Sequence, residues 1–213
     1  LRDEGHAVDV LDLGGGLGAD YQTGQTPSMD EYARAIVPEL LPWVESGGRV
    51  MLEPGRSIAG EAGVLLTRVT YVKLQEKKRF IICDAGMHTL IRPSLYRADH
   101  FVWPADVEAR HVPDAWSFEP DMADLVECDV VGPVCETADF LARDRALPPV
   151  GRGDLIAVFT AGAYGMTMSS TYNEHTRPPE VLVDGDSALL IRRRQPLADL
   201  LRDELAARPM GPA

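Results

Sequence analysis

Lysine is nearly absent from this chain of 213 residues: Lys73, Lys77 and Lys78 are the only three, beside 18 arginines. Acidic residues outnumber lysine and arginine by 33 to 21, which gives a formal net charge of −12. Nucleic acids and anionic membrane surfaces attract basic proteins, so this charge argues against both as partners. Arginine suits fixed contacts with carboxylates and phosphates, although we ascribe most of the 18 to a GC-rich coding bias.

Cysteine and long apolar runs are also scarce. The three cysteines, Cys83, Cys128 and Cys135, form neither an even set nor a metal-ligand spacing. They argue against a disulfide framework and indicate a reducing compartment, so we expect a cytoplasmic protein without a metal site. The longest apolar stretch, residues 155–168, contains glycines and is too short to span a bilayer. The five histidines show no ligand pattern, and we expect them to be structural or on the surface.

The first 60 residues have the pattern of a strand, a helix and a second strand. Residues 8–13, four of which are Val or Leu, predict a buried strand. Ser28 and Glu31 make a capping box before apolar residues spaced three and four apart, which predicts a helix over residues 29–44. A second short strand is expected at residues 49–53. Strands joined by a helix in this way should be parallel.

Each of these two strands leads into a motif that could carry chemistry. Asp-Leu-Gly-Gly-Gly-Leu-Gly (12–18) would let backbone N–H groups approach a phosphate, or is only a tight turn. It lacks the G-x-G-x-x-G spacing of dinucleotide sites. Glu53 and Arg56 place opposite charges three residues apart, as in a surface ion pair or a catalytic site. Both motifs should meet at the carboxyl edge of the parallel strands, where α/β folds bind ligands.

The pattern changes after about residue 62 into short strands separated by turns that are rich in glycine and proline. Asp184 and Gly185 mark a hairpin turn, and helices are expected only at residues 137–143 and 197–207. The expected strands of this part cover residues 64–73, 79–84, 101–103, 125–131, 155–159, 181–183 and 188–192.

The chain therefore divides into an α/β part, residues 1–60, and a mainly β domain, residues 61–213. Two parallel strands cannot bury both faces of their sheet. The chain also begins with Leu1 rather than methionine. We expect the rest of the α/β sheet to precede Leu1 in a longer protein.

Three further groups in the β domain could act on a ligand. Cys135 stands before the expected helix at 137–143, whose dipole would favour a thiolate and a role in proton transfer; an inert cysteine is the alternative. Arg92 and Tyr96, one turn apart, suit a carboxylate, or are a solvated arginine and a packing tyrosine. Tyr164 lies among small residues and is either a ligand contact or a core residue.

Taken in chain order, these motifs resemble the fold type III pyridoxal-phosphate-dependent decarboxylases, and among them the meso-diaminopimelate decarboxylase family. The resemblance covers only the C-terminal half of that family. It implies that residues 1–60 are the end of a (β/α)8 TIM barrel, and that residues 61–213 form a mainly β domain of Greek-key or barrel type. The stretches that carry the resemblance are residues 12–18, 53–63, 84–96, 130–148, 153–173 and 177–185.

The resemblance implies pyridoxal 5'-phosphate as the cofactor and transfers the family's cofactor contacts to matching residues. Glu53 would face the pyridine nitrogen and keep it protonated, which makes the ring an acceptor of electrons. The phosphate and the remaining ring contacts would come from Gly15, Gly16, Gly55, Arg56 and Tyr164.

The same resemblance implies a small amino-acid substrate, meso-2,6-diaminopimelate, which is decarboxylated to L-lysine in the last step of lysine biosynthesis. Cys135 would protonate the carbanion left after carbon dioxide departs. Glu136 would pair with the distal amino group of the substrate. The family places this Cys–Glu segment in the neighbouring subunit's site, so a homodimer with its active site at the interface is implied. The distal carboxylate would be held by Arg56, Arg92 and Tyr96, with Tyr164 beside the substrate.

The family's lysine that binds the cofactor covalently has no match in this chain, because its three lysines cluster on an expected β hairpin. We expect that lysine in a missing N-terminal half of the barrel, and we expect this chain alone to be inactive. Two other hypotheses stay open. A non-catalytic homologue that binds and regulates a decarboxylase would have no need for Cys135 and Glu136. A decarboxylase of ornithine or lysine would have no need for a second carboxylate site at Arg92 and Tyr96.

Overall fold

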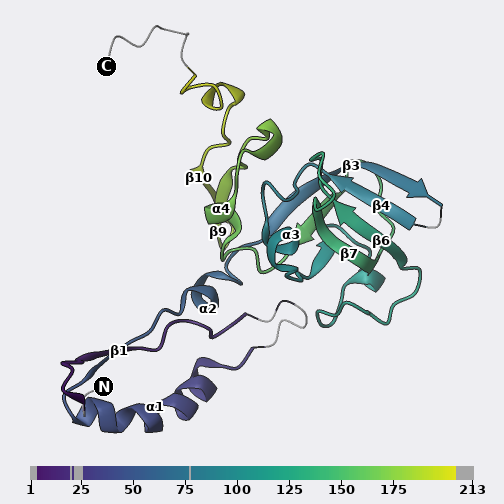
Figure 1. Ribbon diagram of the computed structural model, residues 1–213. Helices are drawn as coiled ribbons and strands as arrows, with labels where there is room; N and C mark the ends of the chain where they lie inside the picture. The colour runs from purple at the N-terminus through teal and green to yellow at the C-terminus, as the bar shows by residue number, and fades with distance from the viewer. Residues whose placement is uncertain (1–3, 20, 22–25, 77, 205–213) are drawn as a thin grey trace, which may run out of the picture.

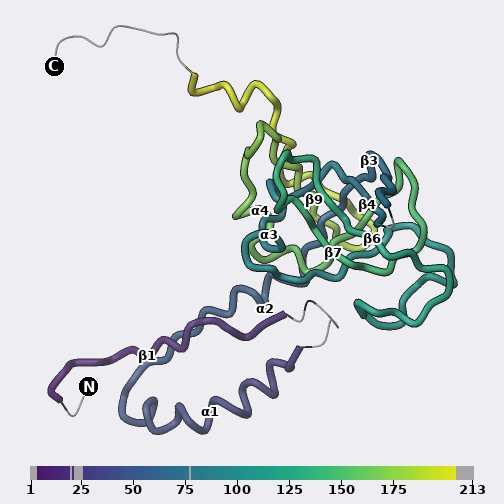
Figure 2. Tube along the Cα trace, turned by 45° about the vertical axis from the view of Figure 1, so that its right-hand side comes forward, coloured from purple at the N-terminus to yellow at the C-terminus, as the bar shows by residue number. Residues whose placement is uncertain are grey.

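A barrel-like β domain and a narrow α/β arm make up the structure of this chain, a computed structural model that describes residues 4–19, 21, 26–76 and 78–204. Figures 1 and 2 both show the arm projecting away from the β domain, with the short helix α2 (Gly55–Ala59) where the two parts join. The C-terminal segment leaves the β domain on a different side from the arm. No helix in the described part of the chain is both long and apolar enough to cross a membrane.

The arm confirms the expected order of strand, helix and strand. Strands β1 (Val10–Asp12) and β2 (Arg49–Met51) pair in parallel, and helix α1 (Met29–Glu45) connects them. Ser28 and Glu31 form the predicted capping box: the Glu31 N–H donates to Ser28 Oγ at 3.2 Å, and the Ser28 N–H donates to Glu31 Oε2 at 2.8 Å. These two strands form a sheet of their own, in which the end of a (β/α)8 barrel is not evident.

The β domain is built on one six-stranded sheet that almost closes into a barrel. Its order is β5-β8-β3-β4-β6-β7, and the two edge strands, β5 and β7, contact each other. Neighbouring strands are antiparallel except β4 and β6, which are parallel. The mainly β, barrel-like prediction is therefore confirmed. The strands are β3 (Leu65–Gln75), β4 (Lys78–Cys83), β5 (Val102–Pro104), β6 (Val126–Val131), β7 (Phe140–Leu147) and β8 (Leu155–Val158).

The interior of this barrel is apolar and includes two of the three cysteines. Cys83 and Cys128 are buried, and burial raises the pKa of each thiol to about 12. Such thiols stay protonated and inert at neutral pH. The largest fully buried side chains are Phe101, Ile81, Leu90, Leu141, Leu147 and Ile156.

The helix expected at residues 137–143 is wrong. Residues 140–147 form strand β7, and Cys135 lies in a loop before it, so no helix dipole acts on its thiol. The physical reason is a pair of register shifts where β6 meets β7, which place Leu141 and Ala142 side by side in the core. The alternation that would reveal a strand is lost there, and the apolar spacing looks helical.

The C-terminal segment holds a short helix and a hairpin. Strands β9 (Glu180–Asp184) and β10 (Ser187–Arg192) pair across the Asp184–Gly185 turn that the sequence predicted, and Gly185 has a φ of +54°. Of the helix expected at 197–207, only a 3-10 turn at Leu197–Asp199 is present, and residues 205–207 lie outside the described part. The remaining short elements are α3 (Arg92–Tyr96), α4 (Gly165–Met168) and 3-10 turns at Ala109–His111 and Tyr172–Glu174.

Candidate functional site

The glycine-rich loop and the Glu-Pro-Gly-Arg motif meet at the carboxyl edge of β1 and β2, as the sequence predicted. The Glu53 N–H donates to the Gly14 carbonyl at 2.8 Å, and the Leu13 N–H donates to the Met51 carbonyl at 3.1 Å. The Gly55 N–H in turn donates to the Glu53 carbonyl at 2.8 Å, which turns the chain into helix α2. Glu53 and the loop therefore share one surface at the end of the arm's sheet.

The loop itself is shaped to receive an anion on its backbone. Gly14 and Gly16 have φ angles of +67° and +88°, and a Cβ built on either meets no atom within 4 Å. A Cβ on Gly15 would lie 2.6 Å from the Glu53 carbonyl oxygen, so that close approach requires glycine. The Gly14 N–H already donates to the Asp12 carboxylate at 2.8 Å, which leaves the N–H groups of Gly15 and Gly16 for a ligand. The open side of this loop fits a phosphate group, such as that of pyridoxal 5'-phosphate.

Two cations and one phenol come together where the arm joins the β domain. The guanidinium carbon of Arg56, on α2, and that of Arg92, on α3, each lie 5.9 Å from the centre of the Tyr164 ring. Arg92 is only 6% exposed. In the part of the chain that the structure describes, no carboxylate forms an ion pair with either arginine. One buried and one half-buried guanidinium, Arg92 and Arg56, suit a carboxylate or phosphate ligand.

Two residues that the sequence reasoning missed complete the surroundings of Arg92. Its Nη1 lies 3.1 Å from His100 Nε2, and its guanidinium lies 4.4 Å from the centre of the Tyr21 ring. Tyr21 packs edge-on against His100 with ring centres 4.8 Å apart. His100, expected to be only structural or on the surface, is fully buried. Its position just before the buried run that starts at Phe101 is the one sequence signal for that burial.

Cys135 and Glu136 lie on a separate exposed loop between β6 and β7. The buried Asp139 carboxylate holds the loop, because it accepts the Met87 and Val134 N–H groups, each at 2.6 Å. Burial raises the pKa of this carboxyl, and the two backbone donors oppose that change. Ser94 Oγ on α3 donates to the Ala138 carbonyl and ties the loop to that helix.

The structure thus brings only some of the predicted site residues together. Within the described residues, no hydrogen bond, ion pair or ring contact joins Cys135 or Glu136 to the Arg56, Arg92 and Tyr164 group. Tyr96 ends helix α3 with 63% of its side chain exposed. The glycine loop and Glu53 form one group, the two arginines with Tyr164 a second, and the Cys135 loop a third.

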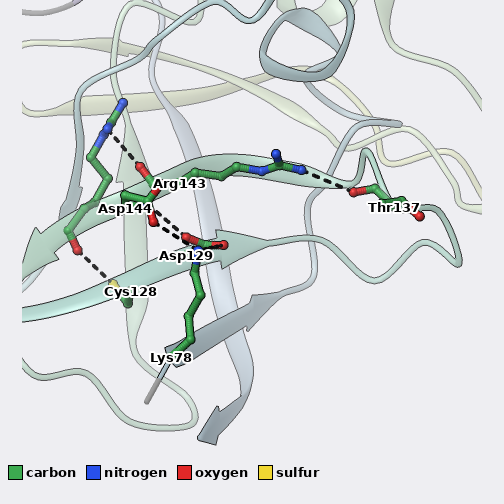
Figure 3. Close-up of polar contacts among 7 residues, drawn as sticks. Lys78, Cys128, Asp129, Thr137, Arg143 and Asp144 are labelled. Atoms are coloured by element: carbon green, nitrogen blue, oxygen red, sulfur yellow. Dashed lines mark hydrogen bonds and ion pairs between the residues drawn. The ribbon is translucent and has the colours of Figure 1, made fainter. Parts of the chain in front are cut away.

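Lys78 is held in an ion-pair network and is unsuited to covalent chemistry. Figure 3 shows it pointing to Asp129 and Asp144, and its Nζ lies 3.0 Å from each carboxylate. Hydrogen bonds to those carboxylates raise the pKa of its ammonium group, whereas a nucleophilic lysine must lose its proton. The sequence had placed Lys78 correctly on a hairpin, and its side chain is 43% exposed there. Lys73 lies on β3, and Lys77 lies outside the described residues.

Comparisons with known proteins agree on one family. Residues 9–162 match the family model described as "Pyridoxal-dependent decarboxylase, C-terminal sheet domain". Diaminopimelate decarboxylase of Pseudomonas aeruginosa is 48% identical over 96% of this chain and 45% of its own length. That of Aquifex aeolicus is 43% identical over 92% of this chain and 43% of its own length. The chain therefore spans less than half the length of these curated relatives.

Solved structures give the same picture. Diaminopimelate decarboxylase from M. jannaschii, solved in complex with L-lysine, has a TM-score of 0.83 and 32% identity over 97% of this chain and 45% of its own. The Helicobacter pylori enzyme, also complexed with L-lysine, has a TM-score of 0.78 and 37% identity over 94% of this chain and 46% of its own. The named relatives and solved structures are diaminopimelate decarboxylases. Since the family model matches residues 9–162, more than half of the chain, the chain belongs to the pyridoxal-dependent decarboxylases.

Proposed function

We propose that this chain is the C-terminal part of a pyridoxal 5'-phosphate-dependent enzyme that converts meso-2,6-diaminopimelate to L-lysine and carbon dioxide. The observation that carries the proposal is the pair of guanidinium groups of Arg56 and Arg92, each 5.9 Å from the centre of the Tyr164 ring. A diamine-forming decarboxylase binds a substrate with one carboxylate, the one it removes. Diaminopimelate keeps a second carboxylate at its far end, and that group needs cations to bind it.

The cofactor would lie against the glycine loop and Glu53. Pyridoxal 5'-phosphate supplies, when bound, an acceptor for the electron pair that carbon dioxide leaves behind. The backbone N–H groups of Gly15 and Gly16 would bind its phosphate, and the carboxylate of Glu53 would keep its ring nitrogen protonated. Gly55, Arg56 and Tyr164 would line the side of the cofactor that faces the substrate.

The substrate's zwitterionic far end requires groups of both charges. Arg92, Arg56 and Tyr96 would bind the distal carboxylate, and Glu136 would bind the distal ammonium group. Cys135 would donate its thiol proton to the α-carbon after decarboxylation, so one proton replaces the lost carboxylate. Placing that proton at one face of the carbon is the role of the protein rather than of the cofactor.

A homodimer would bring the third group to the other two. Cys135 is exposed, and its loop, which Asp139 and Ser94 hold in place, makes no hydrogen bond, ion pair or ring contact with Arg92 or Tyr164 among the described residues. An ordered, exposed loop that carries a thiol and a carboxylate could complete the active site of a second copy of the chain. The proposed active site would therefore lie at the subunit interface, with Cys135 and Glu136 supplied across it.

The domain division is part of the same proposal. Residues 1–60 would be the end of a (β/α)8 barrel, and residues 61–213 the β domain that follows it. The parallel pairing of β1 with β2 supports this, as does the length of the relatives, more than twice that of this chain. The lysine that binds the cofactor would lie in the remainder of the barrel.

The test compares this chain alone with the same chain joined to the N-terminal half of a barrel from a relative. Each protein is incubated with pyridoxal 5'-phosphate and diaminopimelate, lysine or ornithine, and the products are measured by mass spectrometry. We expect L-lysine from diaminopimelate with the joined protein only. Cadaverine or putrescine as the main product would favour a decarboxylase of another basic amino acid. No product from the joined protein, with the relative's own C-terminal half active as the control, would favour a non-catalytic homologue.

A further inference from the structure

The side chain of His100 is buried in contact with Arg92, and no sequence motif assigned it a function. We infer that His100 is a positioning residue, whose unprotonated Nε2 accepts a hydrogen bond from Arg92 and fixes the direction in which the guanidinium faces a bound carboxylate. This inference rests on the proposed function, in which Arg92 binds the distal carboxylate of the substrate. It adds a residue to that site that does not itself touch the substrate.

Two neighbours determine which nitrogen of His100 carries the proton. Its Nδ1 lies 2.8 Å from the Phe159 carbonyl oxygen, which can only accept, so Nδ1 must be the N–H. Its Nε2 lies 3.1 Å from Arg92 Nη1, which can only donate, so Nε2 must carry the lone pair. The neutral ring with its proton on Nδ1 is the one state that satisfies both contacts.

The surroundings of the ring keep it in that neutral state. His100 is fully buried, and this burial, assisted by the positive charge of Arg92, lowers its pKa to about 4. The Phe159 carbonyl and the carboxylate of Asp99, the residue before His100, raise this pKa but have less effect than burial. Tyr21 also packs against the His100 ring, with ring centres 4.8 Å apart. At neutral pH the Nε2 lone pair is therefore permanently available to Arg92.

Arg92 is fixed from two sides by these contacts. Tyr21 covers one face of the guanidinium at 4.4 Å, and His100 binds one of its five N–H donors. Burying an unpaired cation is costly, and a neutral acceptor lowers that cost without cancelling the charge. A carboxylate at His100 would pair with Arg92 and compete with the substrate, whereas a neutral imidazole leaves the positive charge for the ligand.

Two substitutions separate positioning from simple packing. In His100→Asn the short amide can still donate to the Phe159 carbonyl but is too short to reach Arg92. In His100→Gln the longer amide places an oxygen near the position of Nε2 and can accept from Arg92. The matched control is His111→Asn, because His111 is also buried and also contacts a backbone carbonyl, that of Ala123, at 3.3 Å. His111 belongs to a different part of the β domain, in the 3-10 turn after β5.

The kinetic test uses the complete holoenzyme that contains this chain. We expect His100→Asn to raise KM for diaminopimelate about tenfold or more and to change kcat by less than about threefold, since the lost bond holds a charged group. His100→Gln should restore KM to within about threefold of the wild type. An unchanged KM in His100→Asn, or an equal rise in the His111→Asn control, would overturn the inference.

A second readout does not depend on activity. In the holoenzyme labelled with 15N-histidine, the His100 resonances should report a protonated Nδ1 and an unprotonated Nε2 from pH 8 to 5. A protonated Nε2 in that range would also overturn the inference. Failure of the proposed function would look different: the wild-type enzyme would not decarboxylate diaminopimelate, although the tautomer of His100 would be as described.

Discussion

A third buried histidine, His88, makes the stability of the fold depend on pH. It is 3% exposed and stacks on His175 with ring centres 4.4 Å apart. Its Nδ1 is buried without a hydrogen-bond partner among the described residues. Burial and the nearby His175 lower the pKa of His88 to about 4, and the carboxylate of Asp84 opposes them only weakly. The folded protein therefore holds this ring neutral, while the unfolded chain takes up a proton below about pH 6.5.

Acid should consequently weaken the fold through His88. Since the pKa of His88 is lower in the folded state, its contribution to the free energy of unfolding is complete above about pH 6.5. That contribution is lost as the pH falls toward 4. The shift corresponds to a loss of up to about 3 kcal/mol. We expect the His88→Asn variant to lose that much less stability than the wild type between pH 7 and pH 4 in urea titrations. The variant at an exposed position, His6→Asn, should keep the wild-type dependence of the unfolding free energy on pH. The same dependence in all three proteins would contradict this account.

The carboxylate of Asp139 stabilises the loop that carries Cys135. Its two oxygens accept the N–H groups of Met87 and Val134, so it joins two segments that are more than 40 residues apart in sequence. In Asp139→Asn one acceptor oxygen becomes an NH2 group that faces an N–H donor. We expect a loss of about 1–3 kcal/mol of stability and faster hydrogen exchange at Val134. Asp114→Asn, at an exposed position, serves as the control; unchanged exchange at Val134 in the Asp139 variant would refute the role.

At the scale of elements, most strands could be predicted because each is a short apolar or β-branched run between turn residues. The runs at 155–159 and 188–192 agree with β8 and β10 to within one residue. Strand β7 could not be predicted, since its register shifts place Leu141 and Ala142 together in the core. That irregularity arises from pairing with β6, so it is a property of two segments rather than of either sequence alone.

The same distinction applies to the site. The glycine loop and Glu53 were predictable, because each follows its own strand and parallel strands end at one edge. The contact between Arg92 and His100 was not, because it requires α3 to face the chain just before β5. The contact of Tyr164 with Arg56 joins residues more than 100 positions apart. Local patterns therefore located the motifs, and tertiary packing decided which of them meet.

One close crossing of elements sets that packing. The Gly162 N–H donates to the Gly60 carbonyl at 3.0 Å, and a Cβ on Gly162 would lie 1.9 Å from the Ala59 carbonyl oxygen. This crossing presses the segment that carries Tyr164 against the helix that carries Arg56. Only glycine allows the two backbones to approach so closely.

Gly162→Ala should therefore separate the two segments. We expect a loss of about 1–3 kcal/mol or more in stability, because backbone must shift to admit the methyl group. Gly165→Ala is the matched control, since its Cβ would meet only Leu90 Cδ1, at an ordinary 3.8 Å, within helix α4. Thermal unfolding of both variants measures the difference, and a Gly162→Ala protein as stable as the Gly165→Ala protein would show that the crossing is not tight.

At the scale of the whole molecule, much apolar surface faces solvent on the arm and on the C-terminal hairpin. None of the residues of α1 is buried, although the helix has an apolar stripe. All of β10 is exposed, and both faces of the β9–β10 hairpin carry large apolar side chains. A complete folded domain rarely exposes such surfaces. The exposed large apolar residues of these two regions include Met29, Val37, Leu41, Val44, Val181, Val183, Leu190 and Ile191.

This surface predicts how the chain behaves by itself. We expect the isolated chain to bind a hydrophobic dye strongly and to associate with rising concentration in sedimentation experiments, because water contacts with these side chains are unfavourable. The double variant Leu41→Glu and Val183→Glu should reduce both effects, since it charges one position in each region. Glu substitutions at Arg152 and Asp114, which are exposed and polar already, should leave both unchanged. A wild-type chain that is monomeric and does not bind the dye would mean that the arm and hairpin cover their own apolar side chains. The proposal that residues 1–60 are the end of a larger barrel would then lose this physical support.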